Sequence, residues 1–267
     1  MRTSRTSLAV ALTISFSLAG LVSAGTAAAA PPWVERHITL PEHDWAFDFG
    51  LGIAHDYAPP VSPTGVGVNF EMAVSPVSRL ELGFRTGLRM GDDARFTHAD
   101  EYGRLFDRQS FDTSNATIAN PELRVRGAVV RSEVVELALE GRAFLPVNQG
   151  ARFGAMFGVP IFFHLGDRAR IDTGVYVPVV FNTPIDTYFS APFDLWFQPT
   201  AKLWLGPMSG VVFHSVNNHV SVPLGFGLGY QFTHALDLKT QILFPSINDN
   251  QGAQSFGVGV GLQVRIE

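Results

Sequence analysis

Strict alternation of apolar and polar residues is the feature of this 267-residue chain that most limits its fold. In the segment 44–57, large apolar residues such as Trp45, Phe47 and Leu51 take the odd positions, whereas Asp48 and several glycines take the even ones. Because successive side chains of a strand point to opposite faces, a period of two residues predicts a strand with one apolar and one polar or bare face.

The same alternation recurs in twelve segments, most of which are 10 to 15 residues long. Strands of soluble proteins average about 5–6 residues, whereas a tilted strand needs about 9–11 residues to cross a bilayer. The sequence therefore predicts twelve strands that are long enough to cross. They are 44–57, 65–74, 79–90, 122–131, 133–146, 152–166, 168–181, 187–198, 201–213, 219–233, 235–245 and 253–266.

The links between these segments are alternately short and long. The links at Ser132 and His234 are single residues, whereas the link 92–121 is by far the longest. Short turns at one end and long loops at the other are typical of an up-and-down barrel that spans a membrane. A soluble barrel or sandwich would alternate too, but twelve long strands carry more apolar side chains on one face than one closed interior could hold. We therefore predict a single closed antiparallel transmembrane β-barrel.

The first thirty residues have the three-part layout of a secretory signal peptide. Arg2 and Arg5 provide the positive start, an apolar run covers 8–22, and small residues offer cleavage sites between about 24 and 30. The predicted organisation is then a signal peptide over 1–30 and a periplasmic N-terminal segment over 31–43. The barrel follows over 44–267 and contains the long loop 92–121.

Composition excludes several other classes of protein. The chain has no cysteine, which excludes disulfides, thiolate chemistry, cysteine-ligated metals and a lipid-bearing N-terminal cysteine. A formal net charge of -5 argues against a nucleic-acid partner. The scattered histidines, such as His55 and His164, lack the spacing of a metal site, and we expect neither a metal nor another cofactor.

The pattern over 44–267 resembles that of bacterial outer-membrane β-barrel proteins, specifically the porin-like group. The resemblance implies a Gram-negative outer-membrane location, contact with outer-membrane lipid and insertion by the barrel-assembly machinery. Such chains usually end in an aromatic residue, whereas this one ends Val264-Arg265-Ile266-Glu267. The assembly signal at the C-terminus is therefore weaker than in the group it resembles.

The charged side chains of the predicted strands must face the lumen, because an arginine facing lipid at mid-membrane costs about 2–4 kcal/mol. Glycines take the inward positions on the strands near both ends of the barrel sequence. Two interpretations remain open: ion pairs that fill a structural or surface-interaction barrel, or a glycine-lined path through a passive or weakly selective porin-like channel for small solutes. The predicted lumen residues are Glu71, Arg79, Glu81, Arg85, Arg89, Arg124, Arg126, Glu140, Arg142, Arg170 and Asp172.

The long loop 92–121 mixes charged and aromatic residues, and loops of this length are often functional. We predict that it folds over or into the barrel mouth as a constriction. The residues that would form it are Phe96, Tyr102, Arg104 and Phe106.

A lipid-modifying enzyme, such as a lipase or lipid A deacylase, is the third interpretation. Ser215 and His219 are the local pair that nucleophilic catalysis would need. Because the chain contains no Gly-x-Ser-x-Gly sequence, a polar loop explains these residues better. We predict no catalytic residues.

Overall fold

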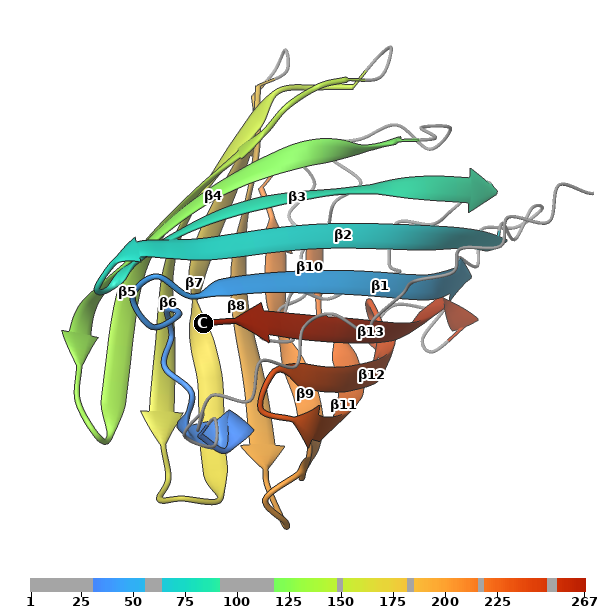
Figure 1. Ribbon diagram of the computed structural model, residues 1–267. Coiled ribbons are helices and arrows are strands. Elements are labelled where there is room, and N and C mark those ends of the chain that lie inside the picture. Colours follow the sequence, from blue (N-terminus) through green and yellow to red (C-terminus); the bar gives the residue numbers. More distant parts are fainter. Residues whose placement is uncertain are drawn as a thin grey trace, which may run out of the picture. The chain divides into compact units, whose positions relative to one another are not determined.

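The computed structural model describes residues 31–55, 64–91, 118–147, 151–181, 185–215, 219–248 and 254–267, and these residues form one closed antiparallel barrel (Figure 1). Its first strands are β1 (Trp45–His55), β2 (Thr64–Val77), β3 (Leu80–Gly91), β4 (Ile118–Arg131), β5 (Val135–Phe144), β6 (Gly154–His164) and β7 (Ala169–Val180). The remaining strands are β8 (Asp186–Phe197), β9 (Leu203–His214), β10 (His219–Ser221), β11 (Leu224–Thr233), β12 (Leu236–Phe244) and β13 (Phe256–Ile266).

Apart from β10 and β11, which do not pair with each other, consecutive strands pair along the sequence, and the pairing of β1 with β13 closes the ring. The short strand β10 and the strand β11 both pair with β9 and together occupy one position, so the wall has the twelve positions predicted from the sequence. The break between them falls at Val222 and Pro223. Proline has no N–H to donate to a strand ladder, which explains the interruption inside the predicted segment 219–233.

Strand β4 begins at Ile118, inside the predicted loop 92–121. Ile118 and Ala119 pair with Leu88 and Gly87 of β3, and the register shifts before Glu122. Pro121 lies at that shift, where a missing ladder donor is tolerated. The strand therefore extends past the proline that the sequence analysis took as the end of the loop.

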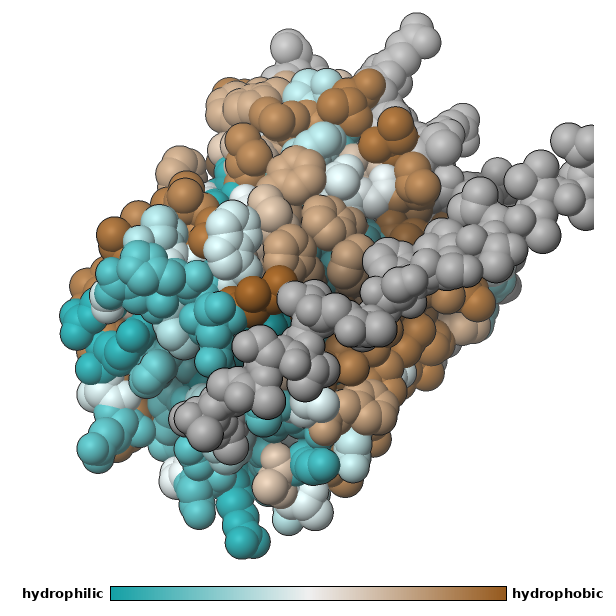
Figure 2. All heavy atoms as spheres, viewed as in Figure 1, coloured by the Kyte–Doolittle hydropathy of each residue, from teal (hydrophilic) through white to brown (hydrophobic). Residues whose placement is uncertain are grey.

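The two faces of the wall have opposite chemistry, as the alternation predicts. Outward side chains are exposed and apolar, with 57% of Leu139 and 67% of Phe157 accessible, whereas the inward Glu81 and Arg126 are fully buried. Figure 2 shows the apolar side chains as a continuous area over the strands and hydrophilic ones gathered at the end where the short turns lie. A surface of this kind suits contact with hydrocarbon rather than with water.

Within the described residues, no helix combines the length and the apolar composition that crossing a lipid bilayer requires.

Residues 31–44, which we call the N-terminal segment, precede β1 and lie inside the ring of strands at its short-turn end. The segment contains the short 3-10 helix η1 (Trp33–Glu35) and has six side chains with at most 8% exposure. These are Trp33, Val34, Arg36, Ile38, Thr39 and Leu40. The expected periplasmic segment is thus packed against the inward face of the barrel.

Candidate functional site: the barrel interior

An alternating chain of arginines and glutamates runs along the inward face of β2 to β5. Arg124 joins Glu71 to Glu81, with both N···O distances 2.9 Å. Arg126 then joins Glu81, at 3.3 Å, to Glu140, at 2.6 Å. Arg142 continues the chain from Glu140, at 2.8 Å, to Glu122, at 2.5 Å. We call these seven residues the ion-pair chain.

The ion-pair chain follows from the period of the strands. Arg124 and Arg126 are two residues apart on β4 and point to the same face, and Glu81 lies opposite Arg126 on β3. Glu140 lies opposite Arg126 on β5, and Arg142 lies opposite Arg124. Facing positions on neighbouring strands bring the charged groups within reach of one another. Planar guanidinium groups can then bind two carboxylates each.

Three further predicted residues also face inward. Arg170 donates to both carboxylate oxygens of Asp172, at 2.6 and 2.9 Å, on β7. Arg85 lies next to the ion-pair chain, with its Nε 3.6 Å from Glu71. All three side chains are at most 3% exposed.

Arg79 does not line the lumen, contrary to the prediction. It lies in the turn between β2 and β3 with a φ of 70°, and its side chain is exposed. The prediction extended the alternation of β3 one residue beyond its first ladder residue, Leu80, into a turn where parity no longer decides direction. The side chain of Arg89 lies outside the described part of the structure.

Trp33 anchors the N-terminal segment on the opposite side of the interior. Its ring stacks on that of Trp204 of β9, with centroids 5.2 Å apart and an interplanar angle of 4°, and meets the edge of Trp196 of β8 at 5.0 Å. The Arg170 guanidinium lies 4.0 Å from the centroid of Trp33. Such stacked and cation–π contacts add to the gain from burial.

Glycines make room for these aromatic rings. A Cβ atom built at Gly229 would lie 2.1 Å from the ring of Trp204, and one at Gly227 would lie 2.6 Å from that of Trp196. The same arrangement occurs at Gly158, where the Tyr176 ring lies 2.3 Å away. At Gly227 and Gly229 of β11, indole rings therefore cover the glycine-lined path that the sequence suggested.

Arg36 connects the segment to two parts of the wall. Its guanidinium forms an ion pair with Asp237 of β12, and its carbonyl accepts a hydrogen bond of 3.1 Å from Arg170 of β7. Burial lowers the pKa of Arg36, the nearby Arg265 acts in the same direction, and Asp237 opposes both. Asp237 is only 1% exposed, so the pair is removed from solvent.

Glu136 of β5 collects several donors from the segment and the wall. Its carboxylate accepts from the Ile38 N–H at 3.1 Å and contacts His37 Nδ1 at 2.6 Å. His164 Nε2 lies 3.1 Å from the same carboxylate, while His164 Nδ1 lies 3.0 Å from the Val34 carbonyl. Glu136 therefore connects the segment, at His37 and Ile38, to His164 of β6.

Two wall residues of the ion-pair chain also hold the backbone of the segment. Arg126 donates to the Ile38 carbonyl at 3.1 Å, and the Leu40 N–H donates to Glu81 at 3.0 Å. The charged wall and the N-terminal segment therefore form one hydrogen-bonded unit.

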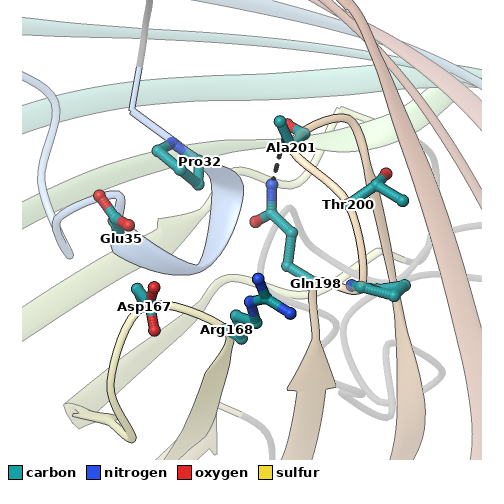
Figure 3. A pocket seen from close by; sticks show the side chains of 8 residues that line it. Pro32, Glu35, Asp167, Arg168, Gln198, Thr200 and Ala201 are labelled. Atoms are coloured by element: carbon teal, nitrogen blue, oxygen red, sulfur yellow. Dashed lines mark hydrogen bonds between the residues drawn. The ribbon is translucent and has the colours of Figure 1, made fainter.

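A pocket of about 150 Å³ remains at the rim, between η1 and the turns that follow β6 and β8 (Figure 3). Gln198 lies at its centre, donates to the Ala201 carbonyl at 3.1 Å and accepts from the Val34 N–H at 3.0 Å. Pro32 and Glu35 line the pocket from the segment, opposite Asp167. Gln198 thus joins the start of the segment to the turn that follows β8.

Ser215 and His219, the pair considered for a lipid-modifying enzyme, contact other residues rather than each other. The Ser215 hydroxyl bonds to the Thr187 carbonyl and lies 3.0 Å from the Thr187 hydroxyl. His219 Nδ1 lies 3.3 Å from the hydroxyl of Ser221. The predicted loop constriction, with Phe96, Tyr102, Arg104 and Phe106, lies outside the described residues.

The aromatic half of the interior and its contacts with the N-terminal segment were not predicted from the sequence. Trp196 shares the inward parity of Asp194 on β8, and Trp204 faces Gly229 across the β9–β11 pair. A large aromatic residue at an inward position opposite a glycine is the signal that could have indicated a filled sector. Nothing in the alternation of the strands identifies Trp33 or Arg36, because they precede the first strand.

Solved structures with the same architecture are outer-membrane channels and porins. The COG4313 outer membrane channel from Pseudomonas putida F1 superposes with a TM-score of 0.61 at 11% identity, covering 85% of this chain and 97% of that one. The NanC porin gives 0.56 at 7%, covering 82% and 100%. The KdgM porin in complex with disordered oligogalacturonate gives 0.54 at 7%, covering 83% and 99%. No family model and no curated protein matches the sequence. At these identities the likeness shows a shared fold.

Proposed function

We propose that this protein is a passive, weakly selective porin-like channel for small solutes in a Gram-negative outer membrane. One observation carries the proposal: a closed barrel has an apolar outer wall and an inner wall built from charged side chains. A polar interior offers water and polar solutes a path that the surrounding hydrocarbon does not. The solved structures that share the fold are named as channels and porins.

The pairing of charges in the wall supports weak selectivity. Each arginine of the ion-pair chain contacts two glutamates, and Arg85 lies beside Glu71. With Arg85 counted, four arginines face four glutamates along this part of the lumen, so the two signs of charge balance. A ring of like charges would instead favour ions of the opposite sign. We therefore expect cations and anions to pass at comparable rates.

Export by a cleaved signal peptide over residues 1–30, insertion by the barrel-assembly machinery and contact with outer-membrane lipid belong to the same proposal. They are supported by the three-part layout of the first thirty residues and by the apolar exposed band on the barrel. Fractionation of cells that produce the full-length chain, with N-terminal sequencing of the mature protein, tests all of them except the assembly step. Depletion of the assembly machinery tests that step.

Reconstitution into planar bilayers tests the channel. The purified, folded barrel should produce discrete conductance steps, with a reversal potential near zero in a salt gradient. A heat-denatured sample of the same preparation is the control. The channel is refuted if the complete chain and a chain that lacks residues 32–40 both stay silent at protein levels where a known porin conducts.

A plugged structural or surface-interaction barrel is the second candidate, and the N-terminal segment favours it. The segment fills part of the interior and bonds to the wall on several sides. If the protein is a channel, the complete chain conducts ions. If it is a plugged barrel, the complete chain does not conduct while this segment is in place.

A further inference from the structure

We propose that the N-terminal segment is a displaceable constriction. While it is bound to the wall it narrows the lumen at the short-turn end, and when it detaches from the wall the lumen becomes wider. The inference rests on the proposed channel function. It assigns a regulatory role to residues 31–44, with Trp33 and Arg36 as the anchors and Pro41–Asp44 as the hinge.

The segment lies across the bore rather than along one side of it. Ile38 bonds to Glu136 of β5, and Arg36, two residues earlier, pairs with Asp237 of β12. In the strand order these two strands are six steps apart in a wall of twelve positions, which is half of the ring. Contacts to opposite strands within three consecutive residues require the backbone to pass through the middle of the lumen.

Side chains of the wall hold the segment, whereas a strand ladder holds every strand. Among the described residues, main-chain hydrogen bonds between the segment and the wall are confined to its end. They join the His43 N–H to the Ser75 carbonyl at 2.7 Å and the Ser75 N–H to the Asp44 carbonyl at 3.1 Å. Residues 31–40 can therefore leave the wall without breaking the barrel's own hydrogen bonds.

The end of the segment has the form of a hinge. The Asp44 N–H bonds to the Pro41 carbonyl at 3.2 Å, and His43 has a φ of 71°, a left-handed conformation that is uncommon for residues other than glycine. The turn is continuous with β1 at Trp45, which fixes one end of the segment to the barrel. At the other end, at η1, the contacts with the wall that the structure describes all involve wall side chains.

When the segment is displaced, the polar wall groups that lose their partners face the lumen, where they can form hydrogen bonds with water. The wall partners that the segment would release include Glu81, Arg126, Glu136 and Arg170, and all four face the lumen. Three of these keep charged wall partners, since Arg126 and Glu81 belong to the ion-pair chain and Arg170 pairs with Asp172. The apolar cost falls on Trp33, which packs between Trp196 and Trp204, and on the buried side chains of Val34, Ile38 and Leu40.

The test compares single-channel conductance of the full chain, a variant that lacks residues 32–40, and a variant whose segment is locked. Ile38→Cys with Ala138→Cys is designed to form a disulfide between the segment and β5. These two residues belong to one buried cluster, and the chain has no cysteine of its own to compete. The two single-cysteine variants, treated with the same oxidant, are the matched controls. Loss of thiol labelling confirms that the lock has formed.

We expect the shortened variant to conduct severalfold more than the full chain. The oxidised double variant should stay at the lowest conductance level of the full chain and lose its transitions to higher levels, and reduction should restore them. Equal conductance of the full and shortened chains would overturn the constriction while leaving the channel intact. Transitions that survive the lock would overturn displacement of the segment. If the shortened chain is also silent, the channel function itself fails and the inference falls with it.

Discussion

Arg36 illustrates how one residue of the interior contacts several strands of the wall at once. Its side chain reaches a carboxylate of β12, and its carbonyl accepts from an arginine of β7 that also contacts Trp33. Removing one partner of a buried ion pair leaves an uncompensated charge, whereas replacing both by apolar groups is often tolerated. The contribution of Arg36 is therefore inseparable from that of Asp237.

We predict that Arg36→Met lowers the free energy of unfolding by up to about 3–5 kcal/mol, because Asp237 loses its partner at 1% exposure. The double variant Arg36→Met with Asp237→Leu should recover most of the loss. Urea unfolding in detergent micelles, followed by the heat-dependent shift in gel mobility, measures both. A double variant as unstable as the single one would contradict this account of the pair.

At the scale of the elements, neighbouring strands are joined by hydrogen bonds and also by the fit of large side chains on one strand over small residues on the next. Gly229 of β11 faces Trp204 of β9, and Gly158 of β6 faces Tyr176 of β7. In both pairs the ring covers the glycine of the adjacent strand. At these positions the inward glycines, which in the sequence suggested an open path, are covered by aromatic side chains.

Gly229→Ala should therefore destabilise the barrel by about 1–3 kcal/mol, since the added methyl group displaces a buried indole and, through it, Trp33. Gly127→Ala is the matched control, because a Cβ atom there meets nothing within 4 Å. Its effect should remain within about 0.5 kcal/mol. Quenching of tryptophan fluorescence by acrylamide provides a second measurement, which should rise for Gly229→Ala only. Equal effects of the two substitutions would contradict the assignment.

At the scale of the whole molecule, the barrel reverses the arrangement of a soluble protein. Arginines and glutamates are buried in the interior, and large apolar side chains cover the outside. Because β1 pairs with β13, every described strand except the short β10 has a partner on both sides, and membrane burial of a sheet requires such pairing. The apolar outer surface and the inner ion pairs therefore both follow from one closed wall of alternating strands.

Leu139 lies near the middle of β5 and is 57% exposed, so Leu139→Arg should cost about 2–4 kcal/mol in a bilayer. Leu139→Val, which keeps the side chain apolar, is the control and should fold normally. The folded fraction in lipid vesicles, separated by gel mobility without heating, gives the measurement. Equal folding of both variants would show that this face does not contact lipid.

The sequence by itself determined the closed barrel, the number of wall positions and which residues face inward. Those properties depend on a period of two residues, which is local and is the same wherever a strand lies. The inward placement of Arg124 and Glu140 follows from it, and the exposed Arg79 marks the point where the strand ends and the period no longer applies.

Only the tertiary structure decided which inward residues meet across the lumen and what lies between them. The N-terminal segment has no periodicity, and its place depends on contacts between Trp33, Arg36 and strands that follow more than 100 residues later. Whether Gly229 opens a path or seats an indole depends on the register of β9 and β11. These are long-range packing relations, and no local pattern in a single chain encodes them.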